Sequence, residues 1–367
     1  MPIYMDRHDV SETVTAKNVA QLHQQDLKIQ HQYNCKGITY WFDEERKTAF
    51  CLIEAPNEKH IQEMHKHAHG EVPHVVIEVD TNIVESFLGR IEDPVKAKNT
   101  DLNIINDPAF RIIMVFRIAK WDQEANRSND SNSINEFHSI CDRIFSNFHG
   151  SVVKHDMQGT MVSFQSVTNA VNCALELQLE FHNKYQGNDQ QAPQLKLGLN
   201  AGLPVTGNKA LFEDTIKFAE RLCAVSKEKI LLSSEVIDLY RSENLNKSMD
   251  ESKVLALTSS DEDFVNQLLD FIEKEWKNSD LKVDSFSKPL GLSKSQLYRK
   301  MISLTAQSPN TFLKEYRLNR ALELIKKKSH TISEIAYDTG FSSLSYFSKC
   351  FLKQYGALPS EYLISIE

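Results

Sequence analysis

The sequence predicts a multidomain protein in which two units of mixed helices and strands precede an all-helical C-terminal unit. Strand-like and helix-like patterns alternate in the first 80 residues, and they alternate again from Phe110 to Ser233. Residues 281–362 instead hold two copies of one pattern: a short apolar helix ends at a glycine, a serine follows two residues later, and an amphipathic helix begins. At 367 residues the chain is long enough for two or three such domains.

The overall composition excludes several broad classes of protein. With 41% hydrophobic and 25% charged residues, the chain resembles neither a membrane protein nor a disordered one. No apolar run approaches the roughly 20 residues that cross a bilayer, and the N-terminus lacks the basic and then apolar pattern of a secretion signal. The six cysteines follow no disulfide framework and indicate reduced thiols. We therefore expect a cytoplasmic protein with no membrane partner.

The first 80 residues are predicted to form one α+β unit. Alternation of apolar and polar residues predicts four short strands, and helical periodicity predicts two helices between them. In chain order these segments are strand 2–7, helix 15–33, strands 37–42 and 48–54, helix 57–69 and strand 75–79. The order β-α-β-β-α-β is that of a ferredoxin-like sandwich.

Histidines are concentrated in this first unit, because eight of the chain's 13 lie within the first 74 residues. His65 and His69 are four residues apart, the spacing at which one helix face offers two imidazoles to a metal. His8 lies just past the first strand, His23 on the first helix and Cys51 on a strand. Imidazole and thiolate suit nickel, zinc or copper better than magnesium or calcium. The alternative is a chance cluster of solvated surface histidines.

Six fragments of this unit form recognisable motifs: Met5–Asp9, Tyr40–Phe42, Phe50–Pro56, His65, Ala68–Gly70 and Ile77–Val79. Together they resemble a small family of nickel-binding ferredoxin-like domains. The resemblance implies a site for nickel or another transition metal. We expect His8, His65 and His69 to be its ligands, with His23 and Cys51 as further candidates.

A second unit of helices and strands is predicted for residues 109–240. The preceding segment, 81–108, is polar, contains two Asp-Pro pairs and is expected to be a linker or an irregular extension. Residues 241–262 are rich in serine, asparagine and acidic residues and are expected to be a hinge before a DNA-binding region at 263–367. The second unit is predicted to contain strand 111–118, helix 134–148, a hairpin of 150–155 and 160–164, helix 170–185, strand 195–201, helix 215–226 and strand 230–233.

Five fragments of the second unit carry a further likeness: Gly150–Lys154, Gly159 with Phe164, Ala170–Gln178, Leu197–Gly202 and Ala219–Cys223. They resemble a class III nucleotidyl cyclase domain, which implies an α/β, ferredoxin-like fold.

The departures from that family argue against catalysis. Two metal-holding aspartates of the family fall on Arg117 and Gln158, and a catalytic asparagine falls on Lys217, whereas Arg221 is kept. Phosphoryl transfer of this type needs metal ions held by carboxylates, so we expect no enzyme activity and no required nucleotide cofactor. Arg117, Lys217 and Arg221 would favour an anion if they faced one cleft. The alternative is that the fold serves only for dimerisation.

Local signals place the helices of the C-terminal unit. Ser293 with Gln296 and Thr331 with Glu334 have the spacing of capping boxes, and Ser308-Pro309 reads as an N-cap followed by proline at the first helical position. One long helix then joins the two helix-turn-helix units. At 1.5 Å per residue it spans roughly 25–30 Å, which suits two recognition helices about 34 Å apart, one turn of DNA.

The charge of this unit agrees with nucleic-acid binding. From Lys282 to Lys353 there are 13 Lys and Arg against 5 Asp and Glu, a balance of +8, while the whole chain carries −8 and the remainder therefore −16. A basic segment on an acidic chain fits phosphate binding. The alternative is an ordinary helical bundle with surface lysines.

Six fragments of this unit match a known pattern: Ser293–Met301, Ser308-Pro309, Arg317–Ala321, Gly340–Ser343, Tyr346–Phe351 and Pro359–Tyr362. They resemble the AraC/XylS family of bacterial transcription regulators. The resemblance implies that the first recognition helix reads bases from Ser295, Tyr298 and Arg299. The second is expected to do so from Leu344, Ser345, Ser348 and Lys349.

The chemistry of these side chains suggests different roles. Arg299 can form the bidentate contact that distinguishes guanine, and Lys349 can hold a phosphate. Leu344 offers only apolar contact, for example to a thymine methyl group. We expect Leu297, Met301, Phe347 and Phe351 to belong to the core.

The combined expectation is a sequence-specific DNA-binding transcription regulator that responds to a transition metal or a small ligand. Its expected partners are double-stranded DNA, a second copy of the chain and RNA polymerase. Two alternatives remain open: an active nucleotidyl cyclase with a DNA-binding tail, and a metal-buffering protein.

Overall fold

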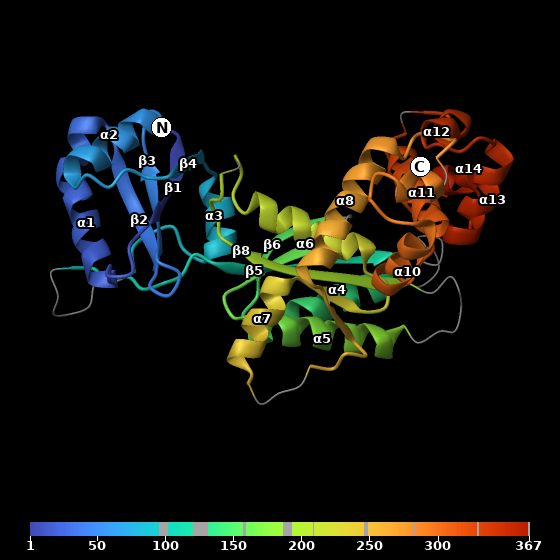
Figure 1. Ribbon diagram of the computed structural model, residues 1–367, viewed down its shortest axis with the longest axis horizontal. Coiled ribbons are helices and arrows are strands. Elements are labelled where there is room, and N and C mark those ends of the chain that lie inside the picture. The colour runs from blue at the N-terminus through green and yellow to red at the C-terminus, as the bar shows by residue number, and fades with distance from the viewer. Residues whose placement is uncertain are drawn as a thin grey trace. The chain divides into compact units, whose positions relative to one another are not determined.

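The structure is a computed structural model that describes residues 1–94, 102–119, 131–156, 159–185, 193–207, 209–245, 249–281, 283–328 and 330–365 (Figure 1). The chain divides into two compact units. One comprises Met1–Met114, His149–Ala170 and Asn200–Ala219, and the other comprises Val115–Phe148, Val171–Leu199 and Glu220–Glu367.

The N-terminal residues form a four-stranded antiparallel sheet with the strand order β2-β3-β1-β4. Helices α1 and α2 lie on the same side of this sheet (Figure 1). This arrangement confirms the predicted ferredoxin-like order. The elements are β1 (Ile3–Asp9), α1 (Ala16–Ile29), the 3-10 helix η1 (Gln30–Tyr33), β2 (Lys36–Asp43), β3 (Thr48–Glu54), α2 (Glu58–Ala68) and β4 (Val75–Glu78).

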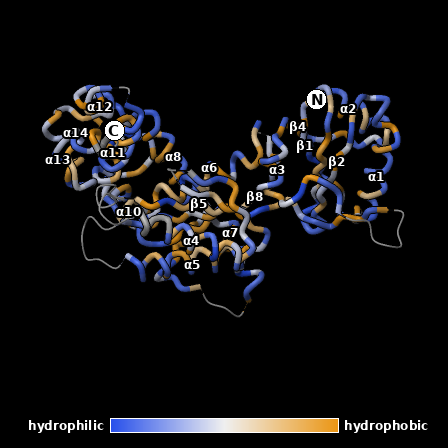
Figure 2. Tube along the Cα trace, turned by 180° about the vertical axis from the view of Figure 1, so that it is seen from behind, coloured by the Kyte–Doolittle hydropathy of each residue, from blue (hydrophilic) through white to orange (hydrophobic). Residues whose placement is uncertain are grey.

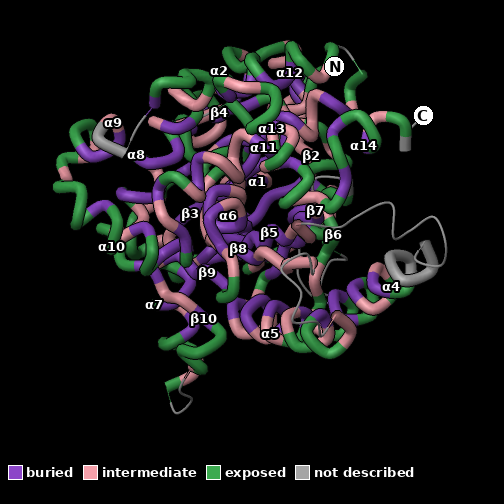
Figure 3. The backbone as a smooth tube through the Cα atoms, turned by 90° about the vertical axis from the view of Figure 1, so that its right-hand side faces the viewer, coloured by how far each residue is buried: buried purple, intermediate pink, exposed green. Residues whose placement is uncertain are grey.

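Side chains from α1, α2 and one face of the sheet form the core of this domain. Tyr40, Phe42, Ile61 and Met64 are fully buried, and burying such side chains contributes about 1.5–3 kcal/mol each. In Figure 3 the buried residues follow the strands, and the exposed residues lie on the outer turns of the helices. This core fixes how α2 sits on β1 and β3, and so positions the side chains that line their contact.

A six-stranded sheet with the order β10-β9-β8-β5-β7-β6 follows. Strands β6 and β7 form the predicted antiparallel hairpin, and β8, β9 and β10 are parallel neighbours. In Figure 2 the hydrophobic residues gather on the strands and on one side of the helices. The elements are β5 (Arg111–Ala119), α4 (Ser131–Asn147), β6 (Ser151–Asp156), β7 (Gly159–Phe164), α5 (Val167–Lys184), β8 (Gln194–Gly202), α6 (Glu213–Val225), β9 (Ile230–Leu232), α7 (Ser234–Glu243) and β10 (Val254–Ala256).

The segment 81–108, expected to be a linker or an irregular extension, begins instead with helix α3 (Thr81–Leu88). The Asp80 side chain caps it, and Phe87 and Leu88 are buried. The buried Arg111 guanidinium donates hydrogen bonds to the carbonyl oxygens of Phe87 and Leu88, at 3.0 and 3.1 Å. These bonds satisfy the last carbonyls of the helix, which have no partner within it. The predicted domain boundaries stay a prediction.

The C-terminal region is helical, as predicted. Its helices are α8 (Ser259–Glu275), α9 (Val283–Ser287), α10 (Lys294–Thr305), α11 (Pro309–Lys327), α12 (Ile332–Asp338), α13 (Leu344–Tyr355) and α14 (Pro359–Ser365). Both expected capping boxes are present, at the starts of α10 and α12, and Ser308 caps α11 with proline at its first position. The local sequence signals therefore set the helix starts, and the long connecting helix α11 joins the two helix-turn-helix units.

The turn after α12 requires glycine. Gly340 has φ +78°, and a Cβ there would lie 2.7 Å from the carbonyl oxygen of Trp276. Arg317 on α11 donates hydrogen bonds to that same oxygen at 2.8 Å and to the carbonyl oxygen of Asn278 at 2.6 Å. The end of α8 is thereby fixed to α11 and α12.

Candidate metal centre and nucleic-acid interface

Four side chains that can bind a metal meet between the N-terminal sheet and α2. Asp6 and His8 are two residues apart on β1 and so lie on one face of the sheet. Cys51 lies on the neighbouring strand β3, and His65 lies in the last turn of α2. All four residues are buried, and their ligand atoms lie within 4.8 Å of one another.

Asp6 is the centre of this group. Its Oδ2 lies 2.9 Å from Nε2 of His65, and its Oδ1 lies 3.5 Å from Nε2 of His8. The backbone N–H of Cys51 donates a hydrogen bond to Oδ1 at 2.9 Å. The Asp6 carboxylate thus lies between the imidazoles of His8 and His65, and a backbone N–H of β3 fixes its position.

Asp26 forms a second group with His65 and His69. Oδ1 of Asp26, on α1, lies 3.1 Å from Nδ1 of His65 and 3.2 Å from Nε2 of His69. Nδ1 of His65 and Nε2 of His69 are themselves 3.3 Å apart. His65 therefore belongs to both groups and presents one ring nitrogen to each carboxylate.

The charges in the two groups stabilise one another. Burial acts to raise the pKa of Asp6, but the charges of His8 and His65 and their hydrogen bonds outweigh it and lower that pKa. Burial also acts to lower the pKa of His65, but hydrogen bonds with Asp26 and Asp6 raise it to about 10. Burial raises the pKa of the Cys51 thiol, and Asp6 raises it further. Without a metal, a positively charged His65 therefore lies between two carboxylates, beside a neutral thiol.

The donor set fits a transition metal. Nε2 of His8 and Oδ1 of Asp26 are buried and have no well-aligned hydrogen bond; their polar neighbours are other members of the two groups, at 3.1–3.5 Å. Imidazole nitrogen, carboxylate oxygen and a thiol converge here, and softer ligands of this kind select nickel, zinc or copper over magnesium and calcium.

The structure brings together most of the residues expected to bind metal. His8, Cys51 and His65 lie in the first group, and His69 lies with His65 in the second. His23 lies outside both groups: it is buried on α1, and its ring centroid is 4.8 Å from that of Tyr40. Burial lowers the pKa of His23, which favours a neutral, packed imidazole.

The sequence reasoning missed the two carboxylates. Asp6 lies two residues before His8 on a strand, and Asp26 lies three residues after His23 on a helix. The predicted strand ended at residue 7 and left His8 outside it, whereas β1 extends to Asp9, so that strand alternation places Asp6 and His8 on one face. Asp26 faces α2 instead of joining His23 in a site, and only the packing of α1 on α2 reveals this.

Helix α10, which was expected to be the first recognition helix, presents the expected side chains to solvent. Ser295, Tyr298 and Arg299 are exposed, with Tyr298 at 52%. On the opposite face Leu297 and Met301 are fully buried, as predicted. A helix with one polar, exposed face and one buried face is suited to entering a DNA groove.

Helix α13, which was expected to be the second recognition helix, is arranged in the same way. Leu344, Ser345 and Lys349 are exposed, Ser348 is half-buried, and the expected core residues of this helix are fully buried. The Ser343 side chain caps its N-terminus. The two helices thus share a capped N-terminus, one exposed face and one buried face.

Arg221, one of the three residues expected to favour an anion, is bonded to side chains of α8. Nη1 of Arg221 donates a hydrogen bond to Oδ1 of Asn266 at 2.6 Å, and Nη2 bonds to the Asp270 carboxylate. These partners on α8 already balance its charge.

The other three positions compared with the cyclase family differ in their exposure and in whether the structure describes them. Lys217 is exposed on α6, and Arg117 is half-buried on β5. Nε of Arg117 has no hydrogen-bond partner. Gln158 lies outside the described residues.

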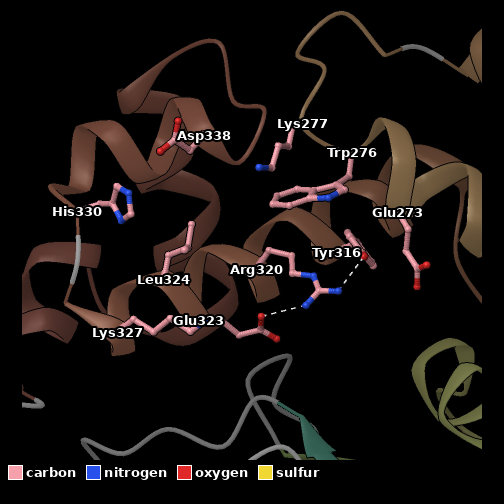
Figure 4. A pocket seen from close by; sticks show the side chains of 10 residues that line it. All are labelled: Glu273, Trp276, Lys277, Tyr316, Arg320, Glu323, Leu324, Lys327, His330 and Asp338. Atoms are coloured by element: carbon pink, nitrogen blue, oxygen red, sulfur yellow. Dashed lines mark hydrogen bonds and ion pairs between the residues drawn. The ribbon is translucent and has the colours of Figure 1, made fainter. Parts of the chain in front are cut away.

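A cavity of about 610 Å³ opens among α8, α11 and α12 in the C-terminal region (Figure 4). Trp276 and Tyr316 line it, and Arg320 bonds to the Glu323 carboxylate at 3.0 Å and to the Tyr316 hydroxyl at 3.1 Å. The remaining lining side chains include both acidic and basic groups. This mixture favours neither an anion nor a cation.

None of the described helices is both long and apolar enough to cross a membrane. All six cysteines are free thiols, five of them buried.

Two protein families match parts of this chain. The family described as "Helix-turn-helix domain" matches residues 286–364. The family described as "Nickel responsive protein SCO4226-like" matches residues 4–79, which include both candidate metal-binding groups.

Curated relatives match the chain over a limited length. Histidine kinase P4 of Formosa agariphila is 37% identical over 108 residues, which cover 29% of this chain and 8% of that protein. The HTH-type transcriptional regulator MtrA of Neisseria gonorrhoeae is 31% identical over 98 residues, which cover 27% of this chain and 31% of that protein. The chain thus spans less than a third of the length of either.

Solved structures resemble separate parts of the chain. SCO4226 from Streptomyces coelicolor A3(2) is 30% identical, covers 21% of this chain and 94% of its own, and has a TM-score of 0.20. An adenylate/guanylate cyclase/hydrolase from Silicibacter pomeroyi is 22% identical, covers 38% of this chain and 84% of its own, and has a TM-score of 0.32. The family matches together place similarity to a helix-turn-helix family in the C-terminal region of the chain and similarity to a SCO4226-like, nickel-responsive family in its N-terminal region.

Proposed function

We propose that the protein is a sequence-specific DNA-binding transcription regulator whose DNA affinity depends on a transition metal held in its N-terminal domain. The observation that carries this proposal is the pair of capped helices α10 and α13. Each exposes polar side chains on one face and buries apolar ones on the other.

Each of the two proposed recognition helices would contact bases with its own set of side chains. In our proposal Ser295, Tyr298 and Arg299 contact bases from α10. Leu344, Ser345, Ser348 and Lys349 do so from α13. The guanidinium of Arg299 suits a guanine edge, whereas the flexible ammonium of Lys349 suits either a base or a phosphate. The connecting helix α11 has 19 residues and hence a length of about 28 Å, which separates the two helices by nearly one DNA turn.

The proposed metal ligands are Asp6, His8, Cys51 and His65, with the Asp26 and His69 side chains beside them. Nickel is the metal favoured by the match of residues 4–79 to a nickel-responsive family. A cation held by these residues would supply positive charge beside Asp6, which the protonated His65 supplies in its absence. Thiolate formation at Cys51 then becomes favourable, because the cation offsets the cost of burying that charge.

Metal can regulate DNA binding only if the two states of the protein bind it with different affinity. If the metal changes the affinity for DNA by some factor, DNA must change the affinity for the metal by the same factor. We also infer that the protein acts as a homodimer, contacts RNA polymerase and does not catalyse nucleotide cyclisation. Arg117 stands where that chemistry needs a carboxylate, and the charge of Arg221 is already balanced by α8.

One experiment tests both parts of the proposal. The full chain is purified, its metal content is measured by elemental analysis, and a preferred duplex is selected from a random-sequence DNA library. Kd for that duplex is then measured with nickel, with magnesium and with chelator. We expect a sequence preference and a change in Kd with nickel alone. No preferred duplex would refute the regulator, and tight nickel binding without a change in Kd would indicate a metal buffer.

A further inference from the structure

Arg221, near the C-terminal end of α6, is held by side chains of α8. Nη1 donates a hydrogen bond to Oδ1 of Asn266 at 2.6 Å, Nη2 bonds to the Asp270 carboxylate, and Oε2 of Glu273 lies 3.8 Å from Nη2. The Arg221 side chain is 8% exposed, whereas those of Asp270 and Glu273 are 60% and 51% exposed. We call these four residues the α6–α8 junction.

A second contact fixes the other end of α8. The backbone N–H of Ser234, at the start of α7, donates a hydrogen bond to Oε1 of Glu262 at 2.5 Å. Helices α6 and α7 flank strand β9 in the chain. The six-stranded sheet region therefore holds α8 both near its N-terminus and near its C-terminal half.

The same helix also contacts the first recognition helix directly. Nζ of Lys300, on α10, donates a hydrogen bond to the carbonyl oxygen of Ser260 at 3.2 Å and lies 3.3 Å from Oδ1 of Asp261. It also lies 5.2 Å from the ring centroid of Phe264. Lys300 immediately follows Arg299, which we propose to contact guanine. A shift of α8 would therefore move the part of α10 that carries Arg299.

We propose that the α6–α8 junction couples the middle region of the chain to DNA recognition by fixing α8, which in turn positions α10. This inference rests on the proposed function and deepens it, since it names the route by which that region affects the DNA-binding surface. Separating α6 from α8 would leave the buried guanidinium of Arg221 without its partners, which is costly, so the two helices are expected to move together.

Charge reversal and its rescue test the junction in the full-length protein. Arg221→Glu places a third carboxylate beside Asp270 and Glu273, and Asp270→Arg in the same chain restores an opposite pair. Arg241→Glu is the matched control, because Arg241 is an exposed arginine on α7 and the charge change is identical. The probe is the duplex selected by the unmodified protein, labelled for fluorescence anisotropy.

We expect Arg221→Glu to weaken binding of that duplex by about fivefold or more, the lower range of allosteric coupling, and the control to change it less than about twofold. The double variant should recover most of the loss. Binding by Arg221→Glu equal to that of the control would overturn the inference.

Hydrogen exchange supplies a readout that does not depend on DNA. In Arg221→Glu the amides of α10 should exchange faster than in the unmodified protein and the control, and the double variant should restore their protection. Unchanged exchange in α10 would also overturn the inference. If no duplex is preferred by the unmodified protein but α10 exchange still depends on Arg221, the regulator proposal fails while the coupling itself stands.

Discussion

His65 and Asp6 form a buried ion pair in which Nε2 lies 2.9 Å from Oδ2, with side-chain exposures of 1% and 0%. Such a pair is costly to desolvate and is retained only where further partners hold both groups. Here the Cys51 N–H donates to Asp6, and Asp26 lies against the other nitrogen of His65. The pair thus joins β1, β3 and α2 and sets the charge of the candidate metal centre.

Replacing Asp6 should change the titration of His65. Asp6→Asn removes one of the two carboxylates that raise the pKa of His65 to about 10, and losing an anion destabilises the protonated imidazole. We expect the pKa of His65 to fall, as measured by NMR titration of its ring protons. A titration unchanged from that of the unmodified protein would contradict the ion pair.

Removing two histidines of α2 should abolish metal binding. His65→Ala combined with His69→Ala deletes the imidazole shared by both groups and one neighbour. Calorimetric titration with nickel should show no binding. The matched control is His60→Ala with His67→Ala on the same helix, where His60 contacts Asn57 and His67 contacts a backbone carbonyl. Unchanged stoichiometry in the first double variant would refute the ligand assignment.

Metal affinity should rise with pH. Because the pKa of His65 is raised to about 10, this imidazole carries a proton at neutral pH, and a metal ion must displace it. Below pH 10 the affinity should therefore increase about tenfold per pH unit for each displaced proton, and the Cys51 thiol contributes a second proton if it binds as thiolate. Titrations in buffers of different ionisation enthalpy measure the released protons. A flat profile between pH 6 and 9 would mean that the metal does not use His65.

Arg299 and Lys349 should contribute to DNA binding in different ways. Arg299→Ala should cost about 1–3 kcal/mol at the selected duplex and relax the base preference at one position. Lys349→Ala, if Lys349 holds a phosphate, should weaken all sequences alike and reduce the salt slope by about 1. Anisotropy titrations on selected and scrambled duplexes separate the two. An equal loss on both duplexes for Arg299→Ala would identify it as a phosphate contact.

Two glycines with positive φ should differ in their tolerance of alanine. A Cβ at Gly340 would meet the Trp276 carbonyl oxygen at 2.7 Å, whereas at Gly291, φ +64°, no atom lies within 4 Å. Gly291→Ala should cost about 1 kcal/mol from its backbone conformation alone. Gly340→Ala should cost about 2 kcal/mol or more of the free energy of unfolding. Urea denaturation measures both, and equal losses would show that the contact at Trp276 relaxes freely.

Local signals explain why the helical region was predictable. Capping at Ser293 and Thr331 and the proline at position 309 act within one helical turn, so sequence alone reveals them. Helix α3 was missed because it is only eight residues long and lies in a polar segment. Its buried face consists of Val84, Phe87 and Leu88, too few residues to show a clear period.

The candidate metal centre was only partly predictable for a different reason. His65 and His69 share one helix, so their spacing was sufficient evidence. Asp26 joins them from α1, and Asp6 from β1, through contacts that depend on how these elements pack. The same dependence leaves His23 outside both groups, which sequence spacing alone could not show. Tertiary packing decides which residues of a helix face the neighbouring helix or strand.

The position of His65 between the two groups would also limit how many ions the domain could hold. A neutral imidazole has one lone pair to donate, and here one ring nitrogen faces Asp6 while the other faces Asp26. Simultaneous occupation of both sides would require an imidazolate bridge, which neutral pH disfavours. Saturation at a single equivalent per chain follows, with the second equivalent bound far more weakly than the first.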